Sequence, residues 1–292
     1  MYERYYGLRE RPFDLTPNPR YLFLSAKHRE ALSHLYYGIC GRKGITVLVG
    51  EAGTGKTTLV HTALERQRDE KTCSVYLSNP LLGRAEFFEF LTWGFGLDAS
   101  AETSKTRFVL ELTRTLTARQ ETGGTSALVI DEAQCLSHEL LEEIRLLANI
   151  ETATDKLLPV VLVGQPELAD RLNEPSLRQL KQRVALRCSL PALDAGETAA
   201  YISNRISVAG GKSDQLFTAG AIETIFEYSQ GIPRTISVIC DNALLGSFAA
   251  DERPVTRDTV LEVCRDFDLR PAAPATVLSS AAAAAPPPSS FF

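Results

Sequence analysis

Residues 45–57 read Ile-Thr-Val-Leu-Val-Gly-Glu-Ala-Gly-Thr-Gly-Lys-Thr and join a short apolar run to a glycine-rich loop. The run Ile45–Val49 is rich in β-branched residues and suits a buried parallel strand, and a helical pattern follows from Lys56. Gly50–Thr57 fits the pattern Gly-x-x-x-x-Gly-Lys-Ser/Thr, in which backbone N–H groups and a helix N-terminus cradle phosphates. A flexible glycine turn is the alternative, but phosphate binding requires this order of strand, loop and helix. The stretch therefore predicts a P-loop that binds a nucleotide.

The P-loop motif also assigns roles to single side chains. Lys56 would reach the β- and γ-phosphates of ATP, and the hydroxyl of Thr57 would ligate Mg²⁺. The expected cofactors are therefore ATP and Mg²⁺. The residues that we expect to bind the nucleotide are Gly50, Glu51, Ala52, Gly53, Thr54, Gly55, Lys56, Thr57 and Thr58.

Two carboxylates follow a second apolar run, Ser126–Ile130. In a parallel sheet they would lie at the edge where ligands bind. Asp131 would hold the Mg²⁺ ion through water, and Glu132 would orient and activate the attacking water. The alternative is that both acids cap the next helix. Because the acids supply the metal partner that the P-loop lacks, the pair favours hydrolysis over simple nucleotide binding.

Three further polar residues fit a hydrolytic site. Gln165 follows the strand-like run 159–164 and would sense the γ-phosphate, unless it is a loop amide bonded to backbone. Arg234 begins a later helical pattern and would bridge to the phosphates, the alternative being a surface arginine. Arg183 precedes the last strand-like run and would act as an arginine finger on a neighbouring subunit's nucleotide. Arg178 and Arg187 compete for that role, and a solvated helix end is the plainer alternative.

Strand-like and helical patterns alternate up to residue 190, and only helical patterns follow. This order predicts an α/β fold with a parallel sheet covered on both faces, followed by a small all-helical domain. The last residues, mostly Ala, Pro and Ser, predict disorder. The expected division is an N-terminal arm and helix packing on the core (1–44), a nucleotide-binding domain (45–190), a helical lid domain (191–268) and a disordered tail (269–292).

The overall charge and the apolar patterning limit the classes of partner. Lys and Arg total 31 against 36 Asp and Glu, so no overall basic field attracts the chain to nucleic acid. The N-terminus lacks the apolar core of a signal peptide, and no apolar stretch reaches the length of a membrane helix. We therefore expect a cytoplasmic protein. The aromatic residues Tyr36, Tyr37, Phe87, Phe88 and Phe90 are expected to be packing positions rather than a base-stacking platform.

Taken together, the loop, the strand that ends in two acids, the polar residue after the next strand and a Gly-x-x-Arg in a helical lid resemble an AAA+ ATPase. Several separate blocks narrow the resemblance to the ATPase of general secretion pathway protein A, over roughly residues 1–268. The blocks are Met1–Leu8, Pro12–Arg20, His28–Leu32, Asp131–Gln134, Ile144–Thr152, Val163–Leu168, Arg178–Arg183 and Gly231–Arg234.

The resemblance implies an ATPase, active as an ATP-dependent homo-oligomer, that works with an inner-membrane partner to help assemble a type II secretion secretin. Such a protein would be cytoplasmic and peripheral at the inner membrane through that partner. Family members of this kind continue into a membrane span and a peptidoglycan-binding domain, which these 292 residues do not contain. Other relatives serve pilus or exosortase-linked exopolysaccharide systems. A DNA-binding regulator of transposition type is the alternative from another class, with a helicase as the weakest, so a nucleic-acid partner is not favoured but stays open.

Overall fold

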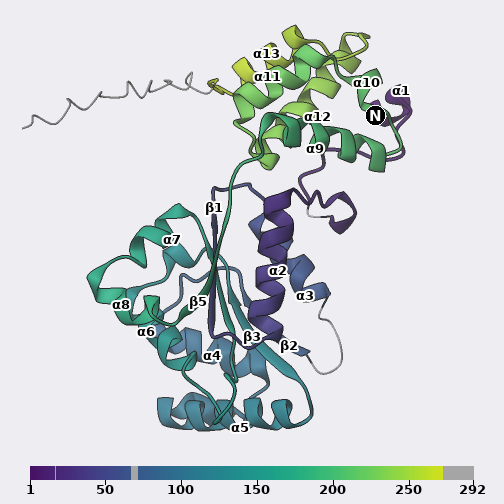
Figure 1. The fold of residues 1–292 in the computed structure, drawn as a ribbon. Helices are drawn as coiled ribbons and strands as arrows, with labels where there is room; N and C mark the ends of the chain where they lie inside the picture. The colour runs from purple at the N-terminus through teal and green to yellow at the C-terminus, as the bar shows by residue number, and fades with distance from the viewer. Residues whose placement is uncertain (17, 67–71, 272–292) are drawn as a thin grey trace, which may run out of the picture.

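The computed structural model describes residues 1–16, 18–66 and 72–271, and the predicted disorder of residues 272–292 lies outside them. A five-stranded parallel sheet forms the centre of the larger part of the molecule (Figure 1). Its strands, in the spatial order β2-β3-β4-β1-β5, are β1 (Ile45–Gly50), β2 (Thr72–Leu77), β3 (Thr125–Ile130), β4 (Val160–Gly164) and β5 (Val184–Leu190). The prediction of an α/β fold with a parallel sheet is confirmed.

Helices cover both faces of the sheet because side chains alternate along each strand. Val47 of β1 packs in one apolar cluster, with helices α4 (Arg84–Phe95), α5 (Lys105–Glu121) and α6 (His138–Leu147). Its neighbour Leu48 packs in another, with α2 (Ala26–Cys40) and α3 (Lys56–Glu65). The short helices α7 (Pro166–Arg171) and α8 (Arg178–Lys181) lie between β4 and β5 in the sequence.

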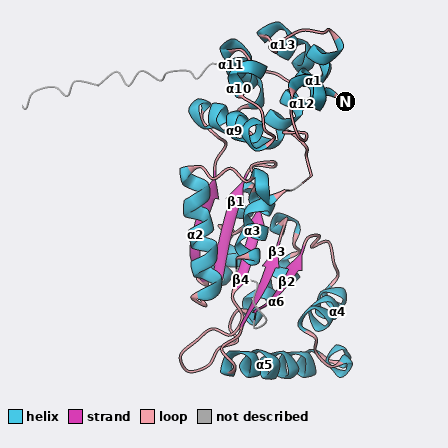
Figure 2. Cartoon of the chain, turned by 90° about the vertical axis from the view of Figure 1, so that its right-hand side faces the viewer, coloured by secondary structure: helices cyan, strands magenta, loops and turns pink. Residues whose placement is uncertain are grey.

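A second group of helices follows the sheet, on the side to which β1 runs (Figures 1 and 2). Its members are α9 (Ala195–Val208), α10 (Ser213–Leu216), α11 (Ala219–Ser229), α12 (Pro233–Ala249) and α13 (Arg257–Asp266). They share one apolar cluster that is separate from the clusters of the sheet. We refer to α9–α13 as the helical group.

The N-terminal segment divides between the two parts, which corrects the expectation that residues 1–44 pack on the core. Helix α2 packs on the sheet, but α1 (Tyr2–Tyr6) and Phe13 belong to the apolar cluster of the helical group. The hydroxyl of Tyr2 bonds to Asp241, and that of Tyr6 donates to the Leu244 carbonyl at 3.1 Å. The reason is that the early aromatic side chains find their apolar partners on α12, so the chain starts on the helical group and crosses to the sheet.

Two further expectations can be compared with the described residues. Tyr36 and Tyr37 on α2 are 49% and 54% exposed, so they are not core positions, because both face away from the sheet that the other side of α2 covers. Phe87 is fully buried as expected. Within the described residues, no helix combines the length and the apolarity that crossing a membrane requires.

Candidate nucleotide site

The glycine loop follows β1 at the carboxyl edge of the sheet and turns directly into α3. Gly53 and Gly55 have φ angles of 82° and 96°, which lie in the left-handed region that side chains disfavour. A Cβ atom at Gly53 would also lie 2.8 Å from the Cβ of Arg234. The loop conformation therefore depends on glycine, and it leaves the N-terminus of α3, with its unpaired N–H groups, open to an anion.

Lys56 is the cation of the loop and is only 5% exposed. Its Nζ donates to the carbonyl of Gly50 at 2.7 Å and to that of Glu51 at 2.9 Å. Burial lowers the pKa of the ammonium group, while the carboxylates of Glu132 and Asp131 act in the opposite direction. The side chain thus lies against the loop that phosphates would occupy. The carboxylates of Glu132 and Asp131 favour its charged form.

Asp131 follows β3 and is held by three hydrogen bonds. Its Oδ2 accepts from the Thr57 hydroxyl and from the Tyr76 hydroxyl, both at 2.7 Å, and its Oδ1 accepts from the Glu132 N–H at 2.9 Å. Burial, and then the hydrogen bond to Asp131, raise the pKa of Tyr76, so this phenol stays a neutral donor. The structure therefore brings together Thr57 and Asp131, which the sequence analysis assigned to the metal.

These contacts provide a test of whether the site fits Mg²⁺. A hydroxyl oxygen and a carboxylate oxygen 2.7 Å apart are the hard oxygen ligands that this ion prefers. Within the described residues, Asp131 forms no ion pair with a lysine, arginine or histidine, although it is only 5% exposed. The donor set fits a divalent cation, which Thr57 and Asp131 would hold.

Glu132 and Gln165 meet because their strands are neighbours. Ile130 of β3 pairs with Leu162 of β4, so the residues that follow both strands lie at the same edge. Gln165 Nε2 donates to Glu132 Oε2 at 3.3 Å. Since β4 lies between β3 and β1, Gln165 also stands between the acids and the glycine loop.

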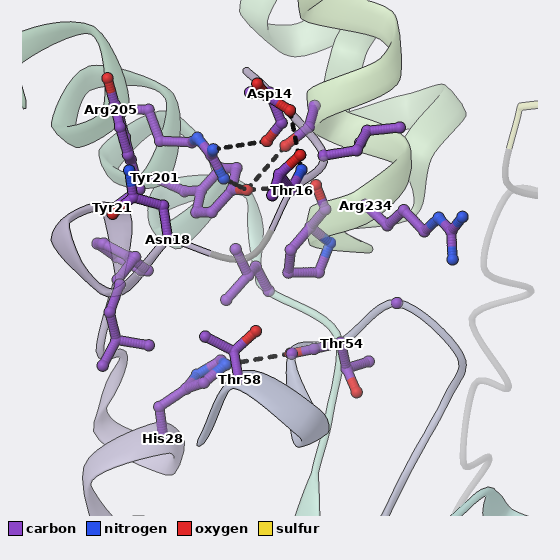
Figure 3. Close-up of a pocket in the computed structure, with 18 residues that line it drawn as sticks. Asp14, Thr16, Asn18, Tyr21, His28, Thr54, Thr58, Tyr201, Arg205 and Arg234 are labelled. Atoms are coloured by element: carbon purple, nitrogen blue, oxygen red, sulfur yellow. Dashed lines mark hydrogen bonds between the residues drawn. The ribbon is translucent and has the colours of Figure 1, made fainter. Parts of the chain in front are cut away.

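A cavity of about 260 Å³ opens beside the loop (Figure 3). Thr54 and Thr58 line it from the loop and α3, and Tyr201 and Pro233 line it from the helical group. From the N-terminal arm it is lined by residues 14–16, 18 and 21–23. This cavity was not predicted, because its walls come from three segments that are far apart in the sequence.

Hydrogen bonds connect the helical group to the arm and α2 to the loop around this cavity. The guanidinium of Arg205 on α9 donates to the Asp14 carbonyl at 3.0 Å and to the Tyr201 hydroxyl at 2.8 Å. His28 Nε2 lies 3.2 Å from the Thr54 carbonyl oxygen, and burial lowers the pKa of this imidazole. A neutral His28 with its proton on Nε2 would donate to Thr54 and so tie α2 to the loop.

Arg234 touches the loop through its backbone. Its N–H donates to the Gly53 carbonyl at 3.2 Å, while its side chain is exposed and extends away from Tyr201 and Arg205 in Figure 3. The helical group therefore contacts the loop directly at the start of α12. The contact of the Arg234 guanidinium with phosphates stays a prediction.

Arg183 lies at the opposite end of the sheet. It precedes β5, whose first residue pairs with Ile45 at the start of β1, and the glycine loop follows the end of β1. At about 3.3 Å per residue, the strand separates Arg183 from its own loop by on the order of 15–20 Å. Arg183, Arg178 and Arg187 are all exposed. At this distance Arg183 would have to serve a site on another molecule, as the finger prediction requires.

Tyr76 is a site residue that sequence reasoning missed. It occupies the penultimate position of β2, and β2 pairs with β3 so that Tyr76 faces Val129 in register. Tyrosine is common in strands, so its identity alone carries no signal. The signal that could have identified Tyr76 is its place on the strand next to β3, which Asp131 follows. Using this signal requires the strand order, which the sequence does not give.

Comparison with known proteins agrees with this geometry. A family model described as an AAA domain matches residues 39–172. General secretion pathway protein A of Aeromonas hydrophila is 40% identical over 261 residues, which cover 89% of this chain and 47% of that protein. The chain thus spans about half the length of this curated relative.

Solved structures show the same fold at low identity. The ORC2 protein of Aeropyrum pernix superposes with a TM-score of 0.64 at 18% identity, covering 88% of this chain and 71% of that one. The RuvB branch-migration motor of Thermotoga maritima gives a TM-score of 0.54 at 20% identity, covering 84% of this chain and 70% of that one. Residues 39–172 therefore match an AAA domain, the chain has the fold of P-loop AAA+ proteins, and it resembles general secretion pathway protein A over most of its length.

Proposed function

We propose that this protein binds ATP with Mg²⁺ and hydrolyses it to ADP and phosphate. The observation that carries the proposal is the meeting of Thr57, Asp131, Glu132 and Gln165 at one edge of the sheet, beside a buried lysine in a glycine loop. A nucleotide-binding protein without hydrolysis would need the loop but not the second acid. Glu132 is therefore the residue that favours a hydrolase.

The proposed chemistry assigns one task to each group. The phosphates lie in the loop, where N–H groups at the start of α3 and the Nζ of Lys56 stabilise their charge. Bound Mg²⁺ would neutralise charge that develops on the phosphate oxygens, and Thr57 and Asp131 would hold it. Glu132 orients a water molecule toward the γ-phosphorus and accepts its proton. Gln165 donates a hydrogen bond near the γ-phosphate, as its amide already points to this edge.

The cavity next to the loop would receive the nucleoside. It opens from Thr54 and Thr58 toward the arm and the helical group, so a base bound there would contact both. The division into arm, nucleotide-binding domain (45–190) and lid (191–268) is part of this proposal. A bound nucleoside would join the lid to the sheet, and the change of ligand during turnover would alter that junction.

We further propose that the protein acts as an assembly ATPase for type II secretion or a related envelope process. The support is the resemblance to general secretion pathway protein A over most of this chain. The exposed Arg183 at the far end of the sheet is consistent with an ATP-dependent homo-oligomer, in which it would reach a neighbour's γ-phosphate. In this proposal the protein works in the cytoplasm, beside an inner-membrane partner.

Steady-state phosphate release with titrated MgCl₂ tests the chemistry. We expect Mg²⁺-dependent hydrolysis by the parent and a loss of about 100-fold or more in Glu132→Gln, since general-base catalysis contributes about 10²–10⁴. Nucleotide binding should persist in Glu132→Gln. The exposed Glu262→Gln on α13 is the matched control and should keep the parent rate. Equal rates in Glu132→Gln and the parent would reject Glu132 as the base.

The biological role has its own test. A tagged Glu132→Gln protein, held with ATP, should recover an inner-membrane component from a detergent extract of its native cells. Recovery of DNA alone, with no envelope component, would instead favour a regulator of transposition type. DNA binding of that kind would weaken steeply with salt, because phosphate contacts release counterions.

A further inference from the structure

Gln134 makes contacts that the proposed chemistry does not yet use. It lies in the short turn Ala133–Cys135 that follows Glu132, and its side chain is half-buried. Its Nε2 donates to Glu132 Oε2 at 2.5 Å, and its Oε1 accepts from the backbone N–H of Gln165 at 3.1 Å. One amide therefore bridges the two residues proposed to act on the water and the γ-phosphate.

The orientation of the Gln134 amide follows from its partners. A backbone N–H can only donate, so the atom that faces Gln165 must be the carbonyl oxygen. The NH₂ group must then face Glu132, and a carboxylate can accept that bond. Gly164 provides the space, because a Cβ atom there would lie 2.7 Å from Gln134 Oε1.

The backbone around Gln134 is also fixed. The guanidinium of Arg171, in the last turn of α7, donates to the carbonyls of Gln134 at 2.5 Å and Leu136 at 2.7 Å. Glu132 has φ 50° and ψ 37°, a left-handed conformation that costs a non-glycine residue of order 1 kcal/mol or more. Such a conformation persists only where neighbouring contacts hold it, and these bonds supply them.

We propose that Gln134 is a positioning residue for ATP hydrolysis, which holds the carboxylate of Glu132 in register with Gln165. The inference rests on the proposed function, because it requires Glu132 to act as the base. Gln134 and Gln165 both donate to Oε2 of Glu132. Within the described residues Oε1 of Glu132 accepts no hydrogen bond, so in this proposal it is the oxygen available to accept from the water.

The bridge also connects the two strand ends. Gln134 follows β3 and Gln165 follows β4, so a displacement of Gln165 by the γ-phosphate would be passed to Glu132 through one amide group. Free movement of either residue would separate the base from the phosphate. A displacement of about 1 Å can cost up to about 100-fold in rate.

Two substitutions test the bridge. Gln134→Glu keeps an oxygen that can accept from the Gln165 N–H but replaces the donor to Glu132 with a second carboxylate. Gln134→Met keeps the length of the side chain and loses both bonds. We expect kcat for ATP to fall about 10-fold or more in both, with KM within about twofold of the parent. The matched control is Gln215→Glu, an exposed glutamine of α10 that introduces the same charge and should leave kcat unchanged.

A double-substitution series separates positioning from a general loss of structure. In the Glu132→Gln background, adding Gln134→Met should cause no further fall in the residual rate, because the base through which Gln134 acts is already absent. Thermal unfolding of each variant shows whether it is folded. Gly164→Ala also displaces the Gln134 amide and should lower kcat, but its Cβ would lie 2.9 Å from Leu168 as well, so its rate is compared only if thermal unfolding shows a folded variant.

The outcomes for the inference and for the proposed function are distinct. If Glu132→Gln is inactive while Gln134→Met and Gln134→Glu keep kcat within twofold, the inference is wrong and the proposed function stands. A raised KM with unchanged kcat, or an additive loss in the Glu132→Gln background, would also overturn the inference. An active Glu132→Gln would overturn both.

Discussion

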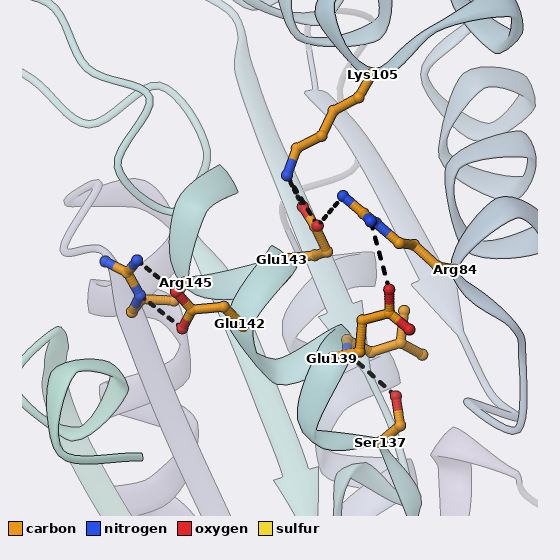
Figure 4. Close-up of polar contacts among 8 residues, drawn as sticks. Arg84, Lys105, Ser137, Glu139, Glu142, Glu143 and Arg145 are labelled. Atoms are coloured by element: carbon orange, nitrogen blue, oxygen red, sulfur yellow. Dashed lines mark hydrogen bonds and ion pairs between the residues drawn. The ribbon is translucent and has the colours of Figure 1, made fainter. Parts of the chain in front are cut away.

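Two buried carboxylates in this molecule, Asp131 and Glu143, have the same exposure and opposite surroundings. Each is 5% exposed. Glu143 on α6 forms ion pairs with Arg84 at 2.6 Å and with Lys105 at 2.7 Å, and these residues begin α4 and α5 (Figure 4). Within the described residues Asp131 forms no ion pair, and its hydrogen-bond partners are two hydroxyl groups and a backbone N–H, while the ammonium group of Lys56 interacts with it through charge alone.

The difference shows how a structural carboxylate can be told from a functional one. Removing a charge from water costs several kcal/mol, and a protein offsets this cost with an opposite charge. The cations beside Glu143 come from the chain itself, and the cluster ties three helices together. Hydroxyl donors around Asp131 orient its oxygens but add no positive charge. A divalent ion would supply that charge.

Neutralising Asp131 should have the largest effect, and it should be an effect on activity. Asp131→Asn keeps the size of the side chain and its ability to accept from Thr57. We expect Mg²⁺-dependent ATP hydrolysis to fall about 100-fold or more, since charge stabilisation of this kind is worth 10²–10³ in rate. The free energy of unfolding without Mg²⁺ should change little, because the substitution removes a buried charge that forms no ion pair among the described residues, which offsets the loss of the acceptor for the Glu132 N–H. Phosphate release measures the effect on activity, and urea denaturation measures the effect on stability. A large loss of stability with normal activity would mean that Asp131 is a structural carboxylate, as Glu143 is.

Neutralising Glu143 should instead affect stability. Breaking a buried pair costs about 3–5 kcal/mol, but the side chains of Arg84 and Lys105 are 41% and 40% exposed, so solvent will screen part of the loss. We expect Glu143→Gln to lower the free energy of unfolding by about 2 kcal/mol in urea denaturation, with kcat unchanged in the folded protein. The neighbouring Glu142→Gln is the control. Its carboxylate is 52% exposed and pairs with Arg145 on the surface, so its loss should stay below about 1 kcal/mol. If Glu143→Gln and Glu142→Gln lose the same free energy of unfolding, the buried ion pairs of Glu143 stabilise the fold no more than a surface pair does.

The sequence predicted Asp131 and not Glu143 for a physical reason. Asp131 and Glu132 end an apolar run in a chain that also carries a glycine loop, and parallel strands bring such ends to one edge. The sheet and the meeting of Thr57, Asp131 and Gln165 follow from that local pattern. Glu143 lies in an amphipathic helix, and Arg84 and Lys105 are far from it in the sequence. Their contacts depend on how helices pack, which local pattern does not specify.

The same reason explains the other differences. The path of α1 on the helical group and the cavity wall at Tyr201 depend on contacts between distant segments. Gln134 was part of a recognised block but received no role, because its hydrogen bonds depend on the turn that follows Glu132. The sequence therefore indicated which residues lie together where they follow strand ends, while their chemical roles stay predictions. It was incomplete where contacts require side chains from separate layers.

Removing one neutral partner of Asp131 should have the smallest effect and sharpens the comparison. Tyr76→Phe deletes the hydroxyl that donates to Oδ2 and leaves the bonds from Thr57 and the Glu132 N–H. If these donors orient Asp131 for a metal ion, the Mg²⁺ concentration for half-maximal activity should rise about 10-fold, which is the usual cost of losing an outer-shell partner. The rate at saturating Mg²⁺ should change little, because the ligand itself remains.

The matched control for Tyr76→Phe is Tyr37→Phe, which removes a hydroxyl from a side chain that is 54% exposed on α2. It should leave the Mg²⁺ dependence at the parent value. An unchanged Mg²⁺ dependence in Tyr76→Phe would mean that its hydroxyl only satisfies a buried carboxylate. Asp131 would then resemble Glu143, as a charge that the chain stabilises for its own folding. A shifted dependence with unchanged stability would instead show that the neutral partners prepare Asp131 for a cation from outside the chain.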